Sequence, residues 1–478
     1  MTITTQTETT LFTPNALRLL CQRYLHKGMG GTDCDRCGEQ HETIDQFFAR
    51  VSMGNDEYRK ELLEPLNFLP NSPTLFNLGV PRGGTLSACF KFDVGDSLLD
   101  GEDSIMAVGH KAAAVTKFGG GVGYALSDVR AKNVLVNSTH GKAMGPVALL
   151  NYYHSVGEMI TQSGKRDAAQ MAILSCDHPD IREFIHAKDD NPQSLRTFNI
   201  SVAITDIFMG MATTDLESDE HALLNEIVDS AWRTGDPGLY FIDEAERGNP
   251  TPWLGRLTGT NPCGEVPLLN NEPCTLGSIN LGNYIDGAGD IDYRRLGYHV
   301  KLATRYLDDI VSINTFPVQE ILEANLMTRK IGLGVCGWAD LLALKGLDYD
   351  TQDAVDLGSE VMRFINEEAE QESLRLGVER GPAPAFMENS SFGNKPRNAT
   401  RTCIAPTGSI AILMGASSGI EPHFALEWTR TLGNGEIIYE RIPVMERIGD
   451  RKPRVSHDIE SKFHVAHQSA FQKYTDLA

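Results

Sequence analysis

Short apolar runs alternate with segments of amphipathic helical periodicity from residue 83 onward, and this alternation constrains the fold more than any other feature. The runs with the length and composition of strands are residues 87–92, 198–204 and 329–335. The clearest helix is predicted from near Thr351 to about Leu376, with Gly377 beyond its end. Strands that alternate with helices favour an α/β architecture, either a barrel or a doubly wound sheet.

The first part of the chain carries helix signals instead. Thr13 followed by Pro14 is typical of a helix start, and Thr43 with Gln46 forms a capping box. We therefore expect a small helical region over residues 1–82 and an α/β domain over residues 83–478.

The composition restricts the class of partner. The chain has 478 residues, of which 41% are hydrophobic and 22% charged, as in ordinary globular proteins. Its net charge of −21 argues against nucleic-acid binding, which needs clustered Lys and Arg. No apolar run approaches the ~18 residues of a membrane span, and no signal peptide is recognisable. We expect a cytoplasmic protein without nucleic-acid or membrane partners, whose nine cysteines are mostly free thiols.

The segment Asn261-Pro262-Cys263-Gly264-Glu265 combines a thiol with a carboxylate and a carboxamide. In an extended segment, side chains at alternate positions share one face, which predicts Asn261, Cys263 and Glu265 in one cavity. There the sulfur can react, the carboxylate can take a proton and the amide can hold a polar substrate. The alternative is turn chemistry, in which Asn-Pro and Cys-Gly pairs are common.

Two further thiols extend this pattern. Cys274 follows the segment closely, and Cys89 lies in the first strand-like run. The alternative for each thiol is a small buried hydrophobic side chain. Cys89 and Cys263 are far apart in the sequence, and the sequence alone does not show whether they meet in the fold.

Other segments predict a phosphorylated ligand. Gly120 and Gly121 lie in a glycine cluster that lets a backbone approach a ligand closely, without the spacing of a dinucleotide fingerprint. Ser72 and Thr74 offer hydroxyls in a turn. A second set of small and hydroxyl residues begins a helix, where free N–H groups bind anions, unless it is an ordinary helix cap. These residues are Ala405, Pro406, Thr407, Gly408, Ser409 and Ile410.

Five motifs in one order carry a specific resemblance. They are Pro-Asn-Ser-Pro-Thr (70–74), Asn-Pro-Cys-Gly-Glu (261–265), Pro-Cys-Thr-Leu-Gly-Ser-Ile-Asn-Leu (273–281), Arg-Lys-Ile-Gly-Leu-Gly-Val-Cys-Gly-Trp-Ala-Asp (329–340) and Ala-Pro-Thr-Gly-Ser-Ile (405–410). Together they resemble the signatures of the ribonucleotide reductase catalytic chain, from about residue 14 to the end. The resemblance implies a ten-stranded α/β barrel of two five-stranded halves, formed here by residues 83–478, with a radical cysteine on a central finger loop.

The resemblance also implies residue roles. Cys263 becomes a thiyl radical that takes the 3′ hydrogen of a ribonucleotide, while Glu265 accepts the proton of the 3′ hydroxyl and Asn261 orients the substrate. Cys89 and Cys274 deliver two electrons, assist loss of the 2′ hydroxyl as water, and end as a disulfide.

The ligand sites follow in the same way. The substrate phosphates, of a di- or triphosphate, are expected on residues 405–410 with Ser72 and Thr74, beside Gly120 and Gly121. A dNTP or ATP effector that selects the base is expected at Asp96 and at a first loop containing Lys165 and Arg166, and residues 189–199 would relay its identity. Further expected partners are a second copy of the chain and a thioredoxin- or glutaredoxin-like reductant.

The radical source is left open between two classes. The residues of the motifs and the lack of an amino-terminal ATP-binding cone resemble the adenosylcobalamin-dependent class. Without the cone, we do not expect ATP and dATP to switch overall activity by that route. The alternative is a radical from a separate ferritin-like metal subunit. Relatives continue beyond the position of Ala478, so we expect a fragment, a split gene product that needs a carboxyl-terminal partner fragment, or a reduced enzyme.

Cys34 and Cys37 form a Cys-x-x-Cys pair with three open interpretations. They are loop cysteines, a redox shuttle that re-reduces Cys89 and Cys274, or two zinc ligands completed by Cys21 and His26. A different class of function is a catalytically inactive, nucleotide-binding regulatory protein on the same fold. The complete set of thiols, carboxylate and amide argues against it.

Overall fold

A computed structural model describes residues 11–27, 41–81, 83–160, 168–189, 195–387, 395–431 and 437–477. The chain divides into two compact units. The first contains Met1–Leu86, Thr275–Ile313 and Arg329–Leu477, and the second contains Ser87–Cys274 and Asn314–Thr328. The residues predicted as a helical region therefore share a unit with two later stretches of the chain.

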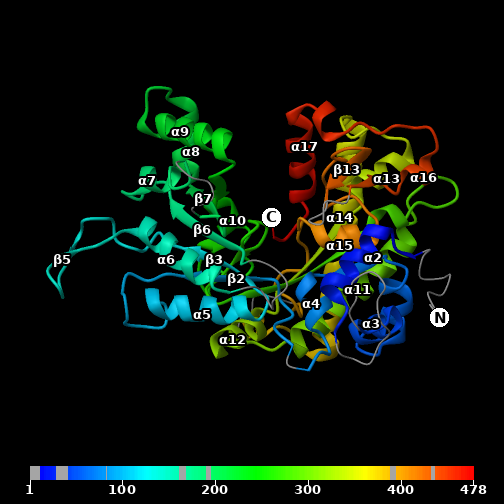
Figure 1. Cartoon of the computed structure of the whole chain (residues 1–478), viewed down its shortest axis with the longest axis horizontal. Coiled ribbons are helices and arrows are strands. Elements are labelled where there is room, and N and C mark those ends of the chain that lie inside the picture. The colour runs from blue at the N-terminus through cyan, green and yellow to red at the C-terminus, as the bar shows by residue number, and fades with distance from the viewer. Residues whose placement is uncertain are drawn as a thin grey trace. The chain divides into compact units, whose positions relative to one another are not determined.

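The second unit is built on a parallel sheet with the strand order β2-β3-β6-β7-β8 (Figure 1). Its strands are β2 (Cys89–Asp93), β3 (Gly121–Ala125), β6 (Gln170–Ser175), β7 (Phe198–Ile204) and β8 (Gly238–Phe241). The strands predicted over residues 87–92 and 198–204 are confirmed by β2 and β7. The predicted α/β class is confirmed as well.

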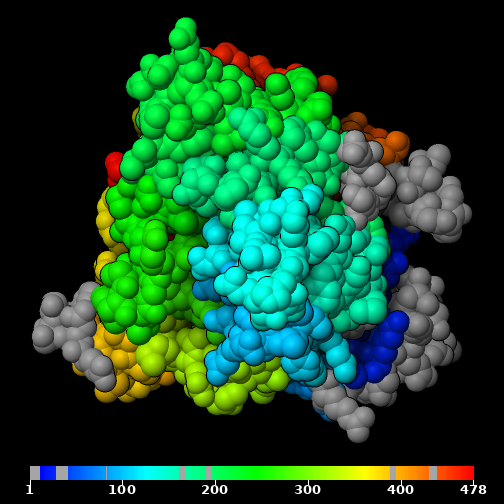
Figure 2. Space-filling model, turned by 90° about the vertical axis from the view of Figure 1, so that its left-hand side faces the viewer, coloured from blue at the N-terminus to red at the C-terminus, as the bar shows by residue number. Residues whose placement is uncertain are grey.

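Helices supply the crossover connections that parallel strands require. These crossovers contain α5 (Ile105–Lys117), α6 (Pro146–Glu158), α7 (Ile181–Ile185), α8 (Asp206–Thr214) and α9 (Asp219–Thr234). Two more helices of the unit are α10 (Ile242–Arg247), which follows β8, and α12 (Gln319–Thr328). The unit also contains the hairpins β4 (Leu135–Val136) with β5 (Gly141–Lys142), and β9 (Gly259–Thr260) with β10 (Pro267–Leu268). Figure 2 shows part of the surface of this unit, from blue through cyan to green. Leu135 of the β4–β5 hairpin is exposed.

The first unit has strands of mixed direction. β11 (Pro273–Asn280), whose first two residues belong to the second unit, pairs antiparallel with β1 (Phe68–Pro70) and parallel with β12 (Ile331–Cys336). Single parallel bridges join Leu333 to Thr402 and Cys403 to Leu477. β13 (Glu427–Thr431) and β14 (Ile437–Arg441) form a separate hairpin. The strand predicted over residues 329–335 is confirmed by β12.

The helices of the first unit are α2 (Pro14–Leu19), η1 (Leu20–Tyr24), α3 (Ile44–Val51), η2 (Tyr58–Leu63), α4 (Ser72–Asn77), η3 (Leu281–Asn283), α11 (Tyr293–Ile313), α13 (Trp338–Lys345), α14 (Gln352–Arg380), η4 (Pro384–Phe386), α15 (Gly408–Met414), α16 (Met445–Ile448), η5 (Ser456–Asp458) and α17 (Ser461–Gln472). The predicted cap at Thr13 and the capping box of Thr43 with Gln46 are confirmed. Within the described ranges, no helix has both the length and the apolar character needed to cross a bilayer.

Helix α14 continues past its predicted end. Gly377 lies inside the helix and is buried, and α14 ends at Arg380. A Cβ atom at Gly377 would collide with the backbone oxygen of Lys395. This glycine therefore serves close packing, and Gly381, with a φ of +87°, follows the helix instead.

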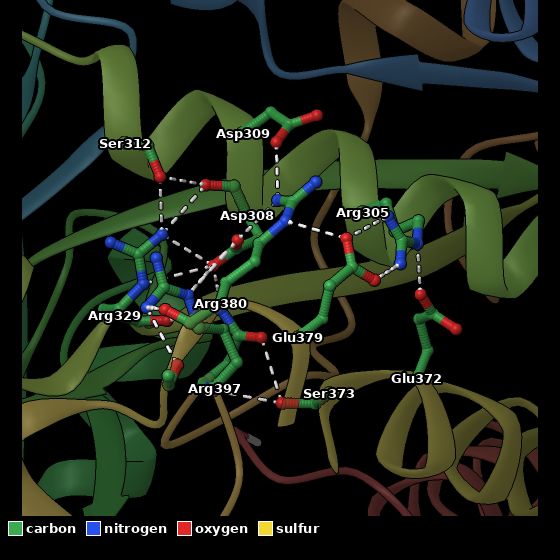
Figure 3. A network of polar contacts seen from close by, with 12 residues as sticks. Arg305, Asp308, Asp309, Ser312, Arg329, Glu372, Ser373, Glu379, Arg380 and Arg397 are labelled. Atoms are coloured by element: carbon green, nitrogen blue, oxygen red, sulfur yellow. Dashed lines mark hydrogen bonds and ion pairs between the residues drawn. The ribbon is translucent and has the colours of Figure 1, made fainter. Parts of the chain in front are cut away.

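A buried ion network joins several elements of the first unit (Figure 3). The carboxylate of Asp308 on α11 is fully buried, and it accepts hydrogen bonds from Arg329 at 2.6 Å and Arg380 at 3.0 Å. Arg397 lies 3.4 Å away. A buried carboxylate without such partners is strongly unfavourable. The network thus anchors the segment just before β12, where Arg329 lies, to α11 and α14.

Candidate active site

The candidate active site is built on the β9–β10 hairpin, whose strands pair antiparallel. Residues 261–266 form the connecting turn, in which the N–H of Gly264 donates to the backbone oxygen of Asn261 at 3.1 Å. Gly264 has a φ of +86°, a left-handed conformation that glycine adopts readily. The expectation of an extended segment with Asn261, Cys263 and Glu265 on one face is therefore wrong, because this turn interrupts the alternation of side chains.

The side chain of Asn261 is the centre of the site. It is buried, and its Nδ2 lies 2.6 Å from Oε2 of Glu265 and 3.1 Å from Sγ of Cys89. Its Oδ1 accepts a hydrogen bond from the N–H of Val266 at 3.0 Å. One carboxamide thus holds the carboxylate, a thiol and the backbone of the turn.

The three predicted thiols differ in access. Cys263 is exposed in the turn, whereas Cys89 and Cys274 are buried. Cys89 and Cys274 are directly opposite each other in the antiparallel pairing of β2 with β11. Opposite residues have Cβ atoms about 4.5–5.5 Å apart, which is close to the spacing of a disulfide. The geometry therefore offers one exposed thiol beside a buried pair that can be oxidised together.

The electrostatics of the site favour neutral groups. Burial raises the pKa of the Cys89 thiol well above its ordinary value, and the Glu265 carboxylate adds to this rise, while the hydrogen bond from Asn261 opposes it. Burial also raises the pKa of Glu265, and the bond from Asn261 again opposes the rise. Cys89 is therefore a thiol rather than a thiolate at neutral pH.

Two glycines of β3 make room for the hairpin. A Cβ atom on Gly121 would lie 2.8 Å from the ring of Pro262, and a Cβ atom on Gly123 would collide with the backbone oxygen of Thr260. At Gly120 a Cβ atom would collide with Phe90 instead. The close approach provided by Gly121 and Gly123 is thus used by the turn segment itself.

Gly123→Ala should displace the hairpin. The added methyl group meets backbone rather than a flexible side chain, so we expect a loss of about 1–3 kcal/mol of unfolding free energy. Because a shift of ~1 Å at a reacting centre costs about 10²-fold in rate, turnover should fall by that order. Thermal unfolding and steady-state turnover measure the two effects. Gly210→Ala is the matched control, since nothing lies within 4 Å of a Cβ atom there; an equal loss in that variant would contradict the explanation.

The predicted hydroxyls at residues 72 and 74 lie in the first unit, at the start of α4. The Ser72 hydroxyl pairs with Tyr24 Oη at 2.8 Å, and the Thr74 hydroxyl donates to the backbone oxygen of Leu86 at 2.9 Å. Both side chains are buried. Their role in substrate binding stays a prediction.

The predicted phosphate segment, residues 405–410, also lies in the first unit. It runs into α15, so the expected helix start is confirmed, with Gly408 as the first helical residue. Thr407 precedes it with a φ of +55°, and its hydroxyl accepts a hydrogen bond from the N–H of Gly419 at 2.7 Å. Phosphate binding by this segment stays a prediction.

The predicted effector residue Asp96 has a partner that the sequence did not indicate. Its carboxylate accepts a hydrogen bond from Nε of Arg130 at 2.8 Å and another from the backbone N–H of Arg130 at 2.9 Å. The Arg130 hydrogen bond helps lower the pKa of Asp96, against the effect of burial. The other predicted residues, Lys165, Arg166, Cys34 and Cys37, lie outside the described residues. So does much of the predicted relay loop over residues 189–199.

Asn199, the last residue of the predicted relay loop, lies near the turn. Its side-chain Nδ2 donates to the backbone oxygen of Pro262 at 2.8 Å, directly before Cys263. Sequence spacing carries no signal for this contact, because the two residues are 63 positions apart. Among the described residues, no group of three or more His, Cys, Asp or Glu side chains has the arrangement of a metal site.

The sequence is similar to that of known proteins. The family model described as "Ribonucleotide reductase, barrel domain" matches residues 87–219, 212–396 and 393–477. A vitamin B12-dependent ribonucleoside-diphosphate reductase of Thermoplasma acidophilum is 40% identical over 462 residues, which cover 87% of this chain and 60% of the relative. A protein of the same name from Mycobacterium tuberculosis is 40% identical over 461 residues, covering 91% of this chain and 65% of the relative.

A more distant relative is the ribonucleoside-diphosphate reductase subunit alpha of Chlamydia pneumoniae, which is 27% identical over 497 residues and 84% of this chain. The chain spans about 60 to 65% of the length of the first two relatives. The family match covers most of the chain, including every described residue of the β9–β10 hairpin. The chain therefore belongs to the ribonucleotide reductase family.

Proposed function

We propose that this chain is the catalytic part of a ribonucleotide reductase, which converts ribonucleotides to 2′-deoxyribonucleotides. The observation that carries the proposal is the contact of Asn261 with both Glu265 and Cys89, beside Cys274 and the exposed Cys263. A regulatory nucleotide-binding protein would not need this combination of thiols, carboxylate and amide.

Each residue then has a chemical task. The radical form of Cys263 takes the 3′ hydrogen atom of the ribose, and Glu265 takes the proton of the 3′ hydroxyl. The 2′ hydroxyl leaves as water after protonation by the thiol pair. Cys89 and Cys274 supply two electrons and end as a disulfide, which a thioredoxin- or glutaredoxin-like protein reduces by exchange. Cys263 finally returns the hydrogen atom to the 3′ carbon, which restores the radical on its sulfur.

The proposed cofactor is adenosylcobalamin. When bound, it supplies an organic radical for thiol chemistry. The exposure of Cys263 fits an external radical source, whereas Cys89 and Cys274 are closed to one by burial. The two relatives at 40% identity are named as vitamin B12-dependent enzymes, which also supports cobalamin. The alternative is a radical from a metal-containing partner subunit, which would suit the subunit alpha relatives at lower identity.

The remaining expectations belong to the same proposal. Residues 405–410 with Ser72 and Thr74 would hold the substrate phosphates, and a nucleotide effector would bind at Asp96 in a homodimer. The first substrate to test is a ribonucleoside diphosphate, as the names of those relatives indicate. A ten-stranded barrel is supported by the parallel sheet of the second unit and by the pairing of β11 with β1 and β12.

The raised pKa of Glu265 gives a pH prediction. The carboxyl group acts as a base only when it is ionised, and burial raises its pKa. We expect the acid limb of the kcat/KM profile to lie above the ordinary glutamate pKa of about 4.3. Glu265→Gln should lower turnover by about 10²- to 10⁴-fold and remove this limb. An unchanged limb in that variant would assign it to another group.

The raised pKa of Glu265 also means that the ionised carboxylate lowers the stability of the fold at neutral pH. A carboxyl group whose pKa is higher in the folded protein stabilises the fold below its unfolded pKa, and this contribution is lost as pH rises through the folded pKa. At neutral pH, Glu265→Gln should therefore unfold at the wild-type temperature or above it. A melting temperature below that of the wild type at neutral pH would contradict the burial of an ionised Glu265.

Nucleotide reduction with adenosylcobalamin and a dithiol, without any added protein subunit, tests the proposed function. Deoxyribonucleotide formation is the expected result. No product under these conditions, followed by product when a radical-generating subunit is added, would support the alternative radical source. No product under either condition would overturn the proposed activity of this chain.

A further inference from the structure

Lys91 is a residue of the second unit to which the chemistry above gives no role. Its side chain has no exposed surface, although it carries an amino group that is charged in water. Burial of an unpaired charge is strongly unfavourable, so Lys91 needs partners. It lies on β2 two residues after Cys89, and alternate residues of a strand share one face of the sheet. Lys91 is therefore on the same face as the buried thiol.

The partners of Lys91 connect β2 to the entry of the hairpin. Its Nζ donates to Oδ1 of Asp93 at 2.5 Å and to the hydroxyl of Thr258. The Thr258 hydroxyl in turn donates to the same Asp93 oxygen at 2.6 Å. Thr258 directly precedes β9, so these three side chains join the strand of Cys89 to the start of the β9–β10 hairpin.

The exit of the hairpin is held by the same two residues of β2. The N–H of Asp93 donates to Oδ1 of Asn270 at 2.9 Å, and the backbone oxygen of Lys91 accepts from the N–H of Asn271 at 3.0 Å. Asn270 and Asn271 follow shortly after β10. Both ends of the hairpin are thus fixed to β2, and the turn between them brings Asn261 to 3.1 Å from Cys89.

We propose that Lys91, Asp93 and Thr258 form a positioning clamp, which holds the Cys263 turn at its working distance from the buried Cys89–Cys274 pair. The clamp touches no reacting atom. It acts through Thr258, at the start of the β9–β10 hairpin. Without the clamp, β9 and β10 still pair with each other, but the position of the hairpin against β2 is no longer fixed. Asn261 then separates from Cys89. The consequence for turnover rests on the proposed function, whereas the positioning itself does not.

Thr258→Val and Thr258→Ser test the clamp. Valine keeps the shape and removes the hydroxyl, whereas serine keeps the hydroxyl. Iodoacetamide labelling of each cysteine, followed by peptide mass spectrometry on the full chain without substrate or cofactor, measures access to Cys89. We expect Thr258→Val to label Cys89 about tenfold faster than the wild type, which corresponds to ~1.4 kcal/mol in an opening equilibrium. Thr258→Ser should stay within about twofold of the wild-type rate.

Two controls separate positioning from general destabilisation. Thr251→Val makes the same chemical change at a buried threonine whose hydroxyl has no hydrogen-bond partner among the described residues, so Cys89 labelling should not change. Cys336, buried in the first unit, reports global unfolding in the same sample. Faster labelling of Cys89 in Thr251→Val, or an equal rise at Cys336 in Thr258→Val, would overturn the clamp, as would wild-type labelling of Cys89 in Thr258→Val.

A second variant tests the shared contact. Lys91→Met keeps an unbranched side chain without a charge, and it should accelerate Cys89 labelling as Thr258→Val does. In the double variant the effects should be no larger than in either single variant, because both remove the same connection. Additive effects would contradict a single clamp. In turnover assays, kcat should fall about tenfold with unchanged KM. A wild type that reduces no nucleotide would overturn the proposed function, and the labelling results would still decide the clamp.

Discussion

Cys263→Ser should abolish nucleotide reduction, with a loss on the order of 10⁵-fold or more. Serine fits the turn, because the side chain at this position is exposed and serine is similar in size to cysteine. The hydroxyl O–H bond is stronger than the thiol S–H bond, so the variant has no side chain that can carry the radical in this turn. Single-turnover formation of a deoxyribonucleotide is the measurement, since it does not require re-reduction of the disulfide.

The control for this prediction is Cys176→Ser, which replaces another free cysteine of the second unit. It should retain turnover. Cys263→Ser should also keep the wild-type melting temperature, since exposed substitutions usually change stability by less than about 0.5 kcal/mol. Its Cys89–Cys274 pair should still form a disulfide with a chemical oxidant. Measurable single turnover in Cys263→Ser would remove Cys263 from the chemistry.

The predictable parts of this fold depend on local signals. The caps at Thr13 and Thr43 and the strands at β2, β7 and β12 were predicted, because neighbouring residues determine helix starts and apolar runs. Gly377 shows where such signals fail. It resembles a helix stop, yet it lies within α14 because residue 395 packs against it, and a contact of this range leaves no local pattern.

The candidate site shows the same division. The chemistry of the residues at positions 261, 263 and 265 indicates a candidate site. The sequence does not indicate its geometry, because the left-handed Gly264 converts an apparent strand into a turn. The contact of Cys89 with Asn261 spans 172 positions. The need for glycine at position 123 arises from the backbone of the hairpin, which lies against β3. Long-range packing decides these features, and a single sequence does not show it.

Asn261→Asp should strongly impair the site although the side chain keeps its size. The new carboxylate would lie where the Asn261 amide now meets Glu265 at 2.6 Å. Two carboxylates at that distance do not both ionise, so they share a proton and the pKa of the pair rises. Glu265 would then be unable to act as a base at neutral pH. We expect a loss on the order of 10³-fold in kcat/KM at neutral pH.

The pH profile distinguishes this explanation from simple loss of a contact. Asn261→Ala removes the hydrogen bond that lowers the pKa of Glu265, so its acid limb should move upward from the wild-type position. Asn261→Asp adds repulsion to that loss, so its limb should lie higher still and activity should partly return as pH rises. The acid limb should therefore lie lowest in the wild type, higher in Asn261→Ala and highest in Asn261→Asp, because it depends on the hydrogen bond and the charge at position 261. Identical limbs in the two variants would mean that Asn261 acts on the substrate alone and does not control the proton of Glu265.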